Sequence, residues 1–164
     1  MLNNLLLNPK EFVIDEIDEI DEIDEIDEID GENNDIYYKR LIENWTPQLE
    51  TEMLEAFIRL YYDEMYGNWG PDDEEESKEY WPEISSPADL VKYTGTEVIL
   101  YALEDAVYVR RKTGNPPYES KNVPVCVILL LNCPWDEDHG WAAVFIDEKF
   151  VKVGRDIVDC VWLD

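Results

Sequence analysis

The sequence predicts an α+β fold in which two to three helices pack on an antiparallel sheet of about five strands, behind an acidic low-complexity N-terminal arm. Apolar residues recur at helical spacing between residues 37 and 65, whereas short apolar or alternating runs separated by turn residues follow from Glu97 onward. Helix-length segments are absent between those runs, so the strands are expected to pair antiparallel. We expect an arm at residues 1–30 and a single domain at residues 31–164.

The composition indicates a folded and strongly acidic protein. The 164 residues include 40 acidic and 13 basic side chains, giving a formal charge of −27. Such a charge repels phosphate backbones and anionic lipid heads, which disfavours direct binding to nucleic acid or to a membrane. With 45% hydrophobic and 12% aromatic residues, the chain has enough apolar surface for a core. The start of the chain lacks a signal-peptide pattern, so we expect a cytoplasmic location.

The arm contains the repeat VIDEIDEIDEIDEIDEID, from Val13 to Asp30. Its isoleucines recur every three residues, which fits neither the period of about 3.6 of a helix nor the period of two of a strand. We interpret the repeat as a solvated arm, of which only the beginning, EFVIDEI, can pair as an edge strand. Without its eleven carboxylates the rest of the chain still carries −16, so the body itself is acidic.

Helix signals come next along the chain. Tyr37, Leu41 and Trp45 recur at i, i+4 and i+8 behind possible caps at Asn34 and Asp35, which predicts a short amphipathic helix.

A second helix is predicted from Thr46-Pro47, an N-cap followed by a proline, to near Gly67. One apolar row of this helix comprises Leu49, Met53, Phe57, Tyr61 and Met65. The capping residue and proline of Ser86-Pro87-Ala88-Asp89 predict a third, short helix. Between the two, GNWGPDDEEESKEYWPEISSP indicates a surface loop, which we expect Trp69, Tyr80 and Trp81 to attach to the body.

Six short runs predict strands: EVILYA, AVYVRR, VPVCVILLLN, WAAVFI, KFVKV and DCVWL. Ile-Asp-Glu-Lys-Phe between two of them predicts a hairpin turn. Val125–Leu131 is apolar without alternation, as is typical of a central strand covered on both faces, and we expect the Thr46–Met65 helix to cover it. Cys126, Cys133 and Cys160 lie in or beside such runs, so we expect reduced core thiols.

The segments PEISSPADL, CPWDEDHGWAAVFIDEKFVKVG and DIVDCVWL carry a resemblance. They are similar to an uncharacterised bacterial domain-of-unknown-function family that places a helical acidic region before Pro-Glu-Ile-x-Ser-Pro and ends with Cys-x-Trp-Asp-x-Glu-His-Gly, a strand, a turn and Val-x-x-Gly. The likeness extends from about Thr51 to Leu163. Asp138 departs from a usual Glu, and the repeat has no place in the pattern. The resemblance implies a fold and a bacterial-type origin, but no activity.

The densest polar cluster is CPWDEDHG, where Asp136, Glu137, Asp138 and His139 offer ligands for a divalent metal. We favour the alternative of a plain turn in which Gly140 takes a conformation that other residues avoid. Asp136, Asp138 and His139 therefore stand as a weak metal candidate only.

Catalytic patterns are scarce. Cys133 and His139 suggest a nucleophile and its base, but such a pair needs spatial contact, which their spacing does not establish. The chain has no P-loop, GxGxxG, GxSxG or HExxH motif and a single histidine, so we expect neither an enzyme nor a cofactor. The run VYVRRK groups Arg110, Arg111 and Lys112, either as a small anion site or, as we favour, at the end of a strand where they neutralise carboxylates.

We predict a small acidic binding protein of the immunity type, which neutralises a basic partner such as a toxin. Its charge favours fast capture of a basic protein, and exposed aromatic residues serve as anchors. The expected binding surface comprises Tyr61, Tyr62, Tyr66, Trp69, Asp72, Asp73, Glu74, Glu75 and Glu76. Two alternatives stay open: a nucleic-acid mimic built on Val13–Asp30, and a metal- or Cys-dependent enzyme centred on Cys133–His139.

Overall fold

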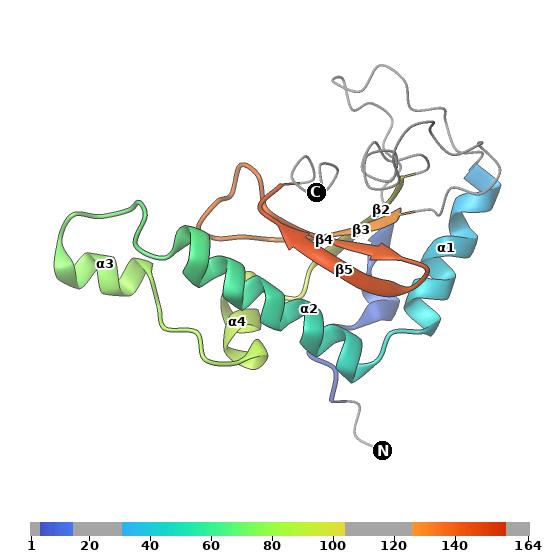
Figure 1. The fold of residues 1–164 in the computed structure, drawn as a ribbon, viewed down its shortest axis with the longest axis horizontal. Helices are drawn as coiled ribbons and strands as arrows, with labels where there is room; N and C mark the ends of the chain where they lie inside the picture. The colour runs from blue at the N-terminus through green and yellow to red at the C-terminus, as the bar shows by residue number, and fades with distance from the viewer. Residues whose placement is uncertain (1–3, 15–30, 104–125, 157–164) are drawn as a thin grey trace.

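A computed structural model describes residues 4–14, 31–103 and 126–156 of the chain (Figure 1). These residues form four α-helices and one five-stranded sheet, which confirms the predicted α+β class. The strands lie in the order β1-β2-β3-β4-β5, and every neighbouring pair is antiparallel except β1 with β2, which is parallel.

The segment before the repeat belongs to the body. A 3₁₀ turn at Pro9–Glu11 precedes β1 (Val13–Ile14), which pairs with the edge of β2 (Val98–Leu103) as the edge-strand prediction expected. Leu7 and Phe12 are 2% and 8% exposed and lie in the core cluster. The expected division at residue 30 therefore leaves core residues on the side assigned to the arm.

A buried carboxylate fastens this segment to the second helix. Glu50 is 2% exposed and accepts hydrogen bonds from the backbone N–H groups of Leu6 (2.6 Å) and Leu7 (3.1 Å). The Nε1 atom of Trp45 donates to the same carboxylate at 3.0 Å. A buried charge is tolerated only when it is paired or hydrogen-bonded, and these three donors meet that requirement.

The second and third predicted helices begin where their capping residues predict, whereas the first begins at Gly31, so the caps expected at Asn34 and Asp35 lie inside it. α1 spans Gly31–Glu43, α2 Pro47–Leu60 and α4 Pro87–Thr94. Thr46 accepts from the N–H of Leu49 at 3.1 Å, and Ser86 accepts from the N–H of Asp89 at 3.2 Å. Each of these two caps is followed by a proline at the first helical position.

The acidic run expected to form a loop contains a further helix, α3 (Glu74–Tyr80), so the described residues hold four α-helices rather than two to three. Asp73 caps α3 by accepting from the N–H groups of Glu75 (3.0 Å) and Glu76 (3.1 Å). Carboxylates in the first turn also suit the positive end of the helix dipole. The local capping signal therefore overrides the loop-like composition.

The sheet is completed by β3 (Cys126–Leu131), β4 (Trp141–Ile146) and β5 (Lys149–Gly154). β3 lies between β2 and β4, and five of its six residues are buried, as expected of a central strand. Asp147 and Glu148, with φ of 49° and 59°, form the predicted β4–β5 hairpin turn. The strands expected at AVYVRR and DCVWL, together with Cys160, lie outside the described residues.

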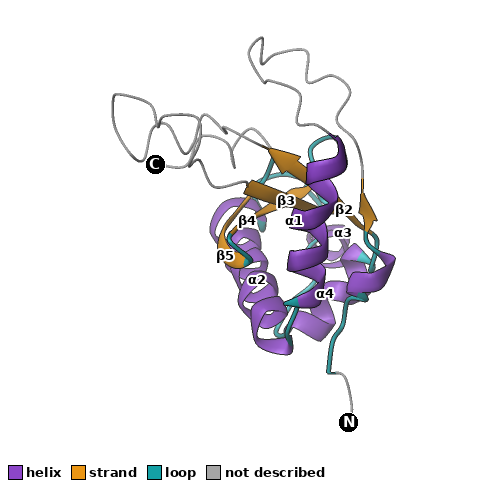
Figure 2. Cartoon of the chain, turned by 90° about the vertical axis from the view of Figure 1, so that its right-hand side faces the viewer, coloured by secondary structure: helices purple, strands orange, loops and turns teal. Residues whose placement is uncertain are grey.

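The core lies between one face of the sheet and the helices, which gather on the same side of it (Figure 2). α2 lies closest to β5 and stacks Phe57 on Trp141 of β4, with ring centroids 5.1 Å apart. The thiols of Cys126 and Cys133 are free and buried, as predicted. The helix α3 stands at one end of the molecule, away from α1 (Figure 1), and has no buried residue.

Candidate functional site

The predicted binding surface begins where α2 changes into a π-helical turn at Tyr61–Met65. The N–H of Tyr66 donates to the carbonyl of Tyr61 at 2.7 Å, which is the wider hydrogen bond of a π turn. Such turns are rare and occur frequently at functional sites. This turn separates the tyrosines of the segment: Tyr61 points into the core, whereas Tyr62 and Tyr66 are 42% and 39% exposed.

Tyr61 is therefore not part of a binding surface, contrary to the prediction. Its side chain is fully buried and its hydroxyl donates to the carbonyl of Pro82 at 2.8 Å. Its ring lies 4.6 Å from that of Trp135 and 5.8 Å from that of Trp81, which is also buried. Burial, followed by the neighbouring tyrosines, raises the pKa of Tyr61 well above its usual range.

Two indole hydrogen bonds connect this region to the turn before β4, and a third lies within the region. Trp69 donates through Nε1 to the carbonyl of Trp135 (3.2 Å), and Trp135 donates through Nε1 to the carbonyl of Tyr80 (2.8 Å). Trp81 closes the set by donating to the carbonyl of Trp69 at 2.7 Å. The segment from Trp69 to Trp81 is thus attached to the body, as predicted, and Trp69 itself is half-buried.

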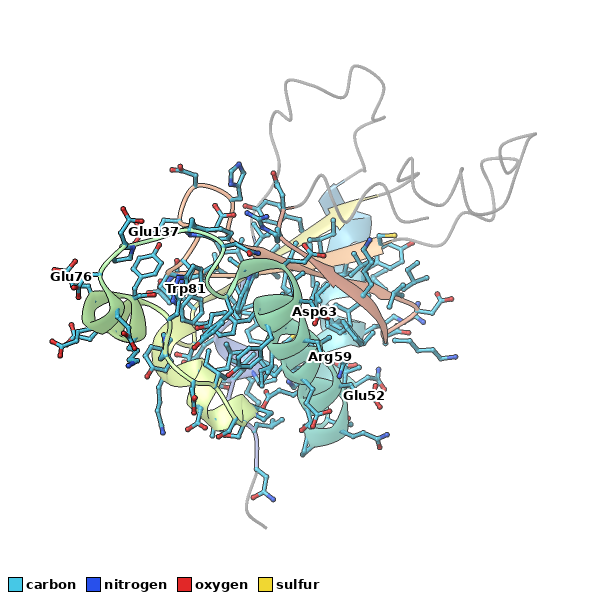
Figure 3. All side chains as sticks on the ribbon, turned by 60° about the vertical axis from the view of Figure 1, so that its left-hand side comes forward. Glu52, Arg59, Asp63, Glu76, Trp81 and Glu137 are labelled. Atoms are coloured by element: carbon cyan, nitrogen blue, oxygen red, sulfur yellow. The ribbon has the colours of Figure 1, made fainter. Side chains whose placement is uncertain are left out.

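We use the name acidic lobe for residues 61–83. They include nine carboxylates and one ammonium group, a net charge of −8. All nine carboxylates are exposed, and the five from Asp72 to Glu76 keep the exposure that the predicted binding surface requires. In Figure 3, Glu76 points outward on α3 while Trp81 lies inward, and Glu137 of the neighbouring turn points outward at the same end.

The cluster CPWDEDHG forms the turn that the sequence favoured. The N–H of Gly140 donates to the carbonyl of Asp136 at 2.9 Å, and Gly140 has φ of 67°, in the region that favours glycine. The carboxylate of Asp136 pairs with His139 Nδ1 (2.7 Å) and accepts from Arg155 (3.1 Å). Desolvation by burial acts to raise the pKa of Asp136, but the interactions with His139 and Arg155 together outweigh it and lower that pKa. The hydrogen bond and charge of Asp136 raise the pKa of His139.

This geometry does not support the weak metal candidate. Asp136 already uses both carboxylate oxygens, one for His139 and one for Arg155. Within residues 4–14, 31–103 and 126–156, no three His, Cys, Asp or Glu side chains are grouped so that they could hold a metal ion. Asp136, Asp138 and His139 therefore act as turn residues in the described structure.

The environment of Cys133 also argues against a nucleophile. Its side chain is fully buried, and burial raises the pKa of the thiol to about 11, so the thiol stays protonated at neutral pH. The ring nitrogen His139 Nδ1 contacts Asp136 rather than the sulfur. The Cys-dependent form of the enzyme alternative thus lacks the activated thiol that it requires. Arg110, Arg111 and Lys112, the candidate anion site, lie outside the described residues.

Sequence reasoning missed one residue of this region. The guanidinium of Arg155 lies 5.0 Å from the centroid of the Trp69 ring while it donates to Asp136. Its position directly after β5 carries no signal of these contacts, because Trp69 is far away in the sequence. Arg155 links the end of β5 to the acidic lobe.

Taken together, the fold and the lobe define a small α+β protein with a fixed acidic surface that carries exposed tyrosines. The chain belongs to the family described as Domain of unknown function (DUF6985), whose model matches residues 8–159. The match confirms the expected kind of family and begins well before Thr51, so it includes the repeat. Neither a curated protein nor a solved structure matches the chain. None of the helices in the described ranges is long and apolar enough to cross a membrane.

Proposed function

We propose that this chain is a binding protein that neutralises a basic protein partner, in the manner of a bacterial immunity protein acting on a basic toxin. The supporting observation is the acidic lobe, a single segment that contains nine exposed carboxylates and the exposed rings of Tyr62 and Tyr66. A surface of one charge sign raises the association rate of an oppositely charged protein, and tyrosines are common anchors at interfaces.

The rigidity of the lobe supports the same proposal. The three indole hydrogen bonds and the Asp73 cap hold α3 and its carboxylates in one arrangement. A surface that is already ordered loses less conformational entropy when a partner binds. The free thiols of Cys126 and Cys133 fit a reducing compartment, so we place the interaction in the cytoplasm.

The test is binding between the purified full chain and any basic protein encoded beside its gene, followed by stopped-flow kinetics at several salt concentrations; the absence of such a binding partner would count against the proposal. A lobe variant carries Glu75→Gln, Glu76→Gln and Glu79→Gln. These positions leave the capping Asp73 intact. The matched control carries Glu43→Gln, Glu52→Gln and Glu55→Gln, which removes the same charge from exposed positions outside the lobe.

We expect the lobe variant to associate about tenfold more slowly at low salt, with a smaller effect at high salt, because local charges dominate steering. The control should stay close to the unmodified chain. Equal slowing of both variants would show that net charge alone is responsible and would remove the lobe from the proposal. Asp15–Asp30, on which the nucleic-acid-mimic alternative depends, lie outside the described residues.

A further inference from the structure

This end of the molecule already holds one guanidinium group, that of Arg155. The group lies over the Trp69 ring at 5.0 Å and donates to the Asp136 carboxylate at 3.1 Å. Its buried Nε atom has no hydrogen-bond partner. The ring face and the carboxylate therefore hold this arginine although one of its donors stays unpaired. The Trp69 ring face and the Asp136 carboxylate therefore form one binding arrangement for a guanidinium group in this protein.

Tyr62 and Tyr66 offer exposed rings in a segment that also carries exposed carboxylates. Their rings lie 5.4 Å apart at an angle of 43°, and both are exposed. The hydroxyl of Tyr62 donates to the carbonyl of Ile84 (3.0 Å) and accepts from its N–H (2.8 Å), which fixes the ring. The exposed carboxylates of Asp63 and Glu83 are close in sequence to these contacts. Within the described part of the chain, no Lys or Arg lies over either tyrosine ring.

We propose that Tyr62 and Tyr66 receive an arginine side chain of the basic partner, so that the partner's contact segment is rich in arginine rather than lysine. The proposal rests on the function proposed above and specifies which side chain of the partner the acidic lobe would bind. A planar guanidinium can stack on a ring while it donates sideways to a carboxylate. An ammonium group is compact and strongly hydrated, so it gains less from the ring face. The charge of −8 on the lobe is complementary to such a segment.

The experiment titrates the full chain with a short capped arginine peptide and with a lysine peptide of the same length and spacing, by calorimetry. Three proteins are compared: the unmodified chain, Tyr66→Leu and Tyr66→Phe. The leucine removes the ring face, whereas the phenylalanine keeps the ring and removes only the hydroxyl. We expect Tyr66→Leu to weaken the arginine peptide about two- to fivefold, with a smaller change for lysine and none for Tyr66→Phe.

The ring contacts of Tyr66 with Tyr61 and Trp81 make a folding defect in the leucine variant a concern. A second measurement on the unmodified chain avoids it by following the tyrosine ring resonances during the arginine titration. Shifts at Tyr62 and Tyr66 support the proposal, whereas shifts confined to α3 overturn it. Equal affinity for both peptides, unchanged in Tyr66→Leu, also overturns it but leaves the proposed function standing. If neither peptide binds at low salt, the proposed function itself fails.

Discussion

Glu50 is the residue whose loss should reveal how the N-terminal segment is held. Its carboxylate accepts from Leu6 N, Leu7 N and Trp45 Nε1 at 2.6–3.1 Å, in a site where it is 2% exposed. Glu50→Ala removes the acceptor and leaves the donors of Leu7 and Trp45 buried without a partner. Each buried unpaired donor costs about 1–3 kcal/mol, and a lost charged acceptor adds to this. We expect a loss of about 3–5 kcal/mol in the free energy of unfolding.

Glu50→Gln distinguishes the effect of the hydrogen bonds from the effect of removing the side-chain volume, because glutamine is nearly the same size as glutamate. Glutamine keeps one acceptor oxygen but turns an amide N–H₂ toward a donor, so we expect a smaller loss of about 1–3 kcal/mol. Glu52→Ala is the matched control, because Glu52 is exposed and, among the described residues, accepts a hydrogen bond only from Gln48, at 3.2 Å. It should change stability by less than about 0.5 kcal/mol.

Urea unfolding followed by tryptophan fluorescence measures these differences, and amide hydrogen exchange at Leu6 and Leu7 localises them. In Glu50→Ala, both amides should lose protection before the strands of the sheet do. If Glu50→Ala unfolds at the same urea concentration as Glu52→Ala, the carboxylate does not fasten the segment. The same conclusion follows if Leu6 and Leu7 exchange as slowly as in the unmodified chain.

Three further predictions concern single positions. Asp147→Gly should raise the free energy of unfolding, measured by urea denaturation, by about 0.5–1 kcal/mol. The reason is that the Asp147 φ of 49° suits glycine, while the ion pair between Arg40 and Glu148 is kept. A lower free energy of unfolding would show that the turn is not strained. Gly70→Ala should lower the free energy of unfolding by about 2–3 kcal/mol, because φ is 107° and a Cβ would lie 2.9 Å from Tyr80 Cδ1. Gly67→Ala is the control, since Gly67 has φ of 74° but lies in open space, and it should lower the free energy of unfolding by about 1 kcal/mol. Equal shifts of the melting temperature for the two variants would contradict the clash. The hydrogen bond to Asp136 raises the pKa of His139 above 6.5, so the stabilising contribution of protonated His139 is complete below pH 6.5 and is lost as the pH rises through the raised pKa. The urea midpoint measured against pH should therefore lose this dependence in His139→Gln. An unchanged pH profile would refute the pairing of His139 with Asp136.

Local signals predicted the starts of α2 and α4 and the hairpin because each depends on adjacent residues. Thr46-Pro47 and Ser86-Pro87 each place a hydroxyl acceptor before a proline, and both act as the expected caps. Asp73 and Glu76 carry a similar signal for α3, but the acidic run and the Gly and Pro residues before it indicated a loop. The burial of Tyr61 was also present in the sequence, since Tyr61 continues the apolar row of Met53 and Phe57. Its assignment to the surface followed composition instead.

The remaining features depend on residues that are distant in the sequence. Trp69 and Trp135 are joined by a hydrogen bond, and Arg155 stacks on Trp69, but no sequence period relates these positions. The burial of Glu50 is equally nonlocal, because its donors include the N-terminal residues Leu6 and Leu7. A single sequence shows that such side chains exist, whereas only the packed fold decides which donor meets which acceptor.

The structure of the acidic lobe depends on such contacts between residues that are distant in the sequence. α3 has seven residues and no buried side chain, and an isolated helix of that length is unstable in water. Its first-turn carboxylates also repel one another, apart from the pair that Glu74 forms with Lys78. The indole donors of Trp69, Trp81 and Trp135 supply the missing attachment. The tryptophans therefore keep the carboxylates in a fixed surface. If the proposed function holds, we expect charge to set the association rate of the partner and the exposed tyrosines to set its dissociation rate.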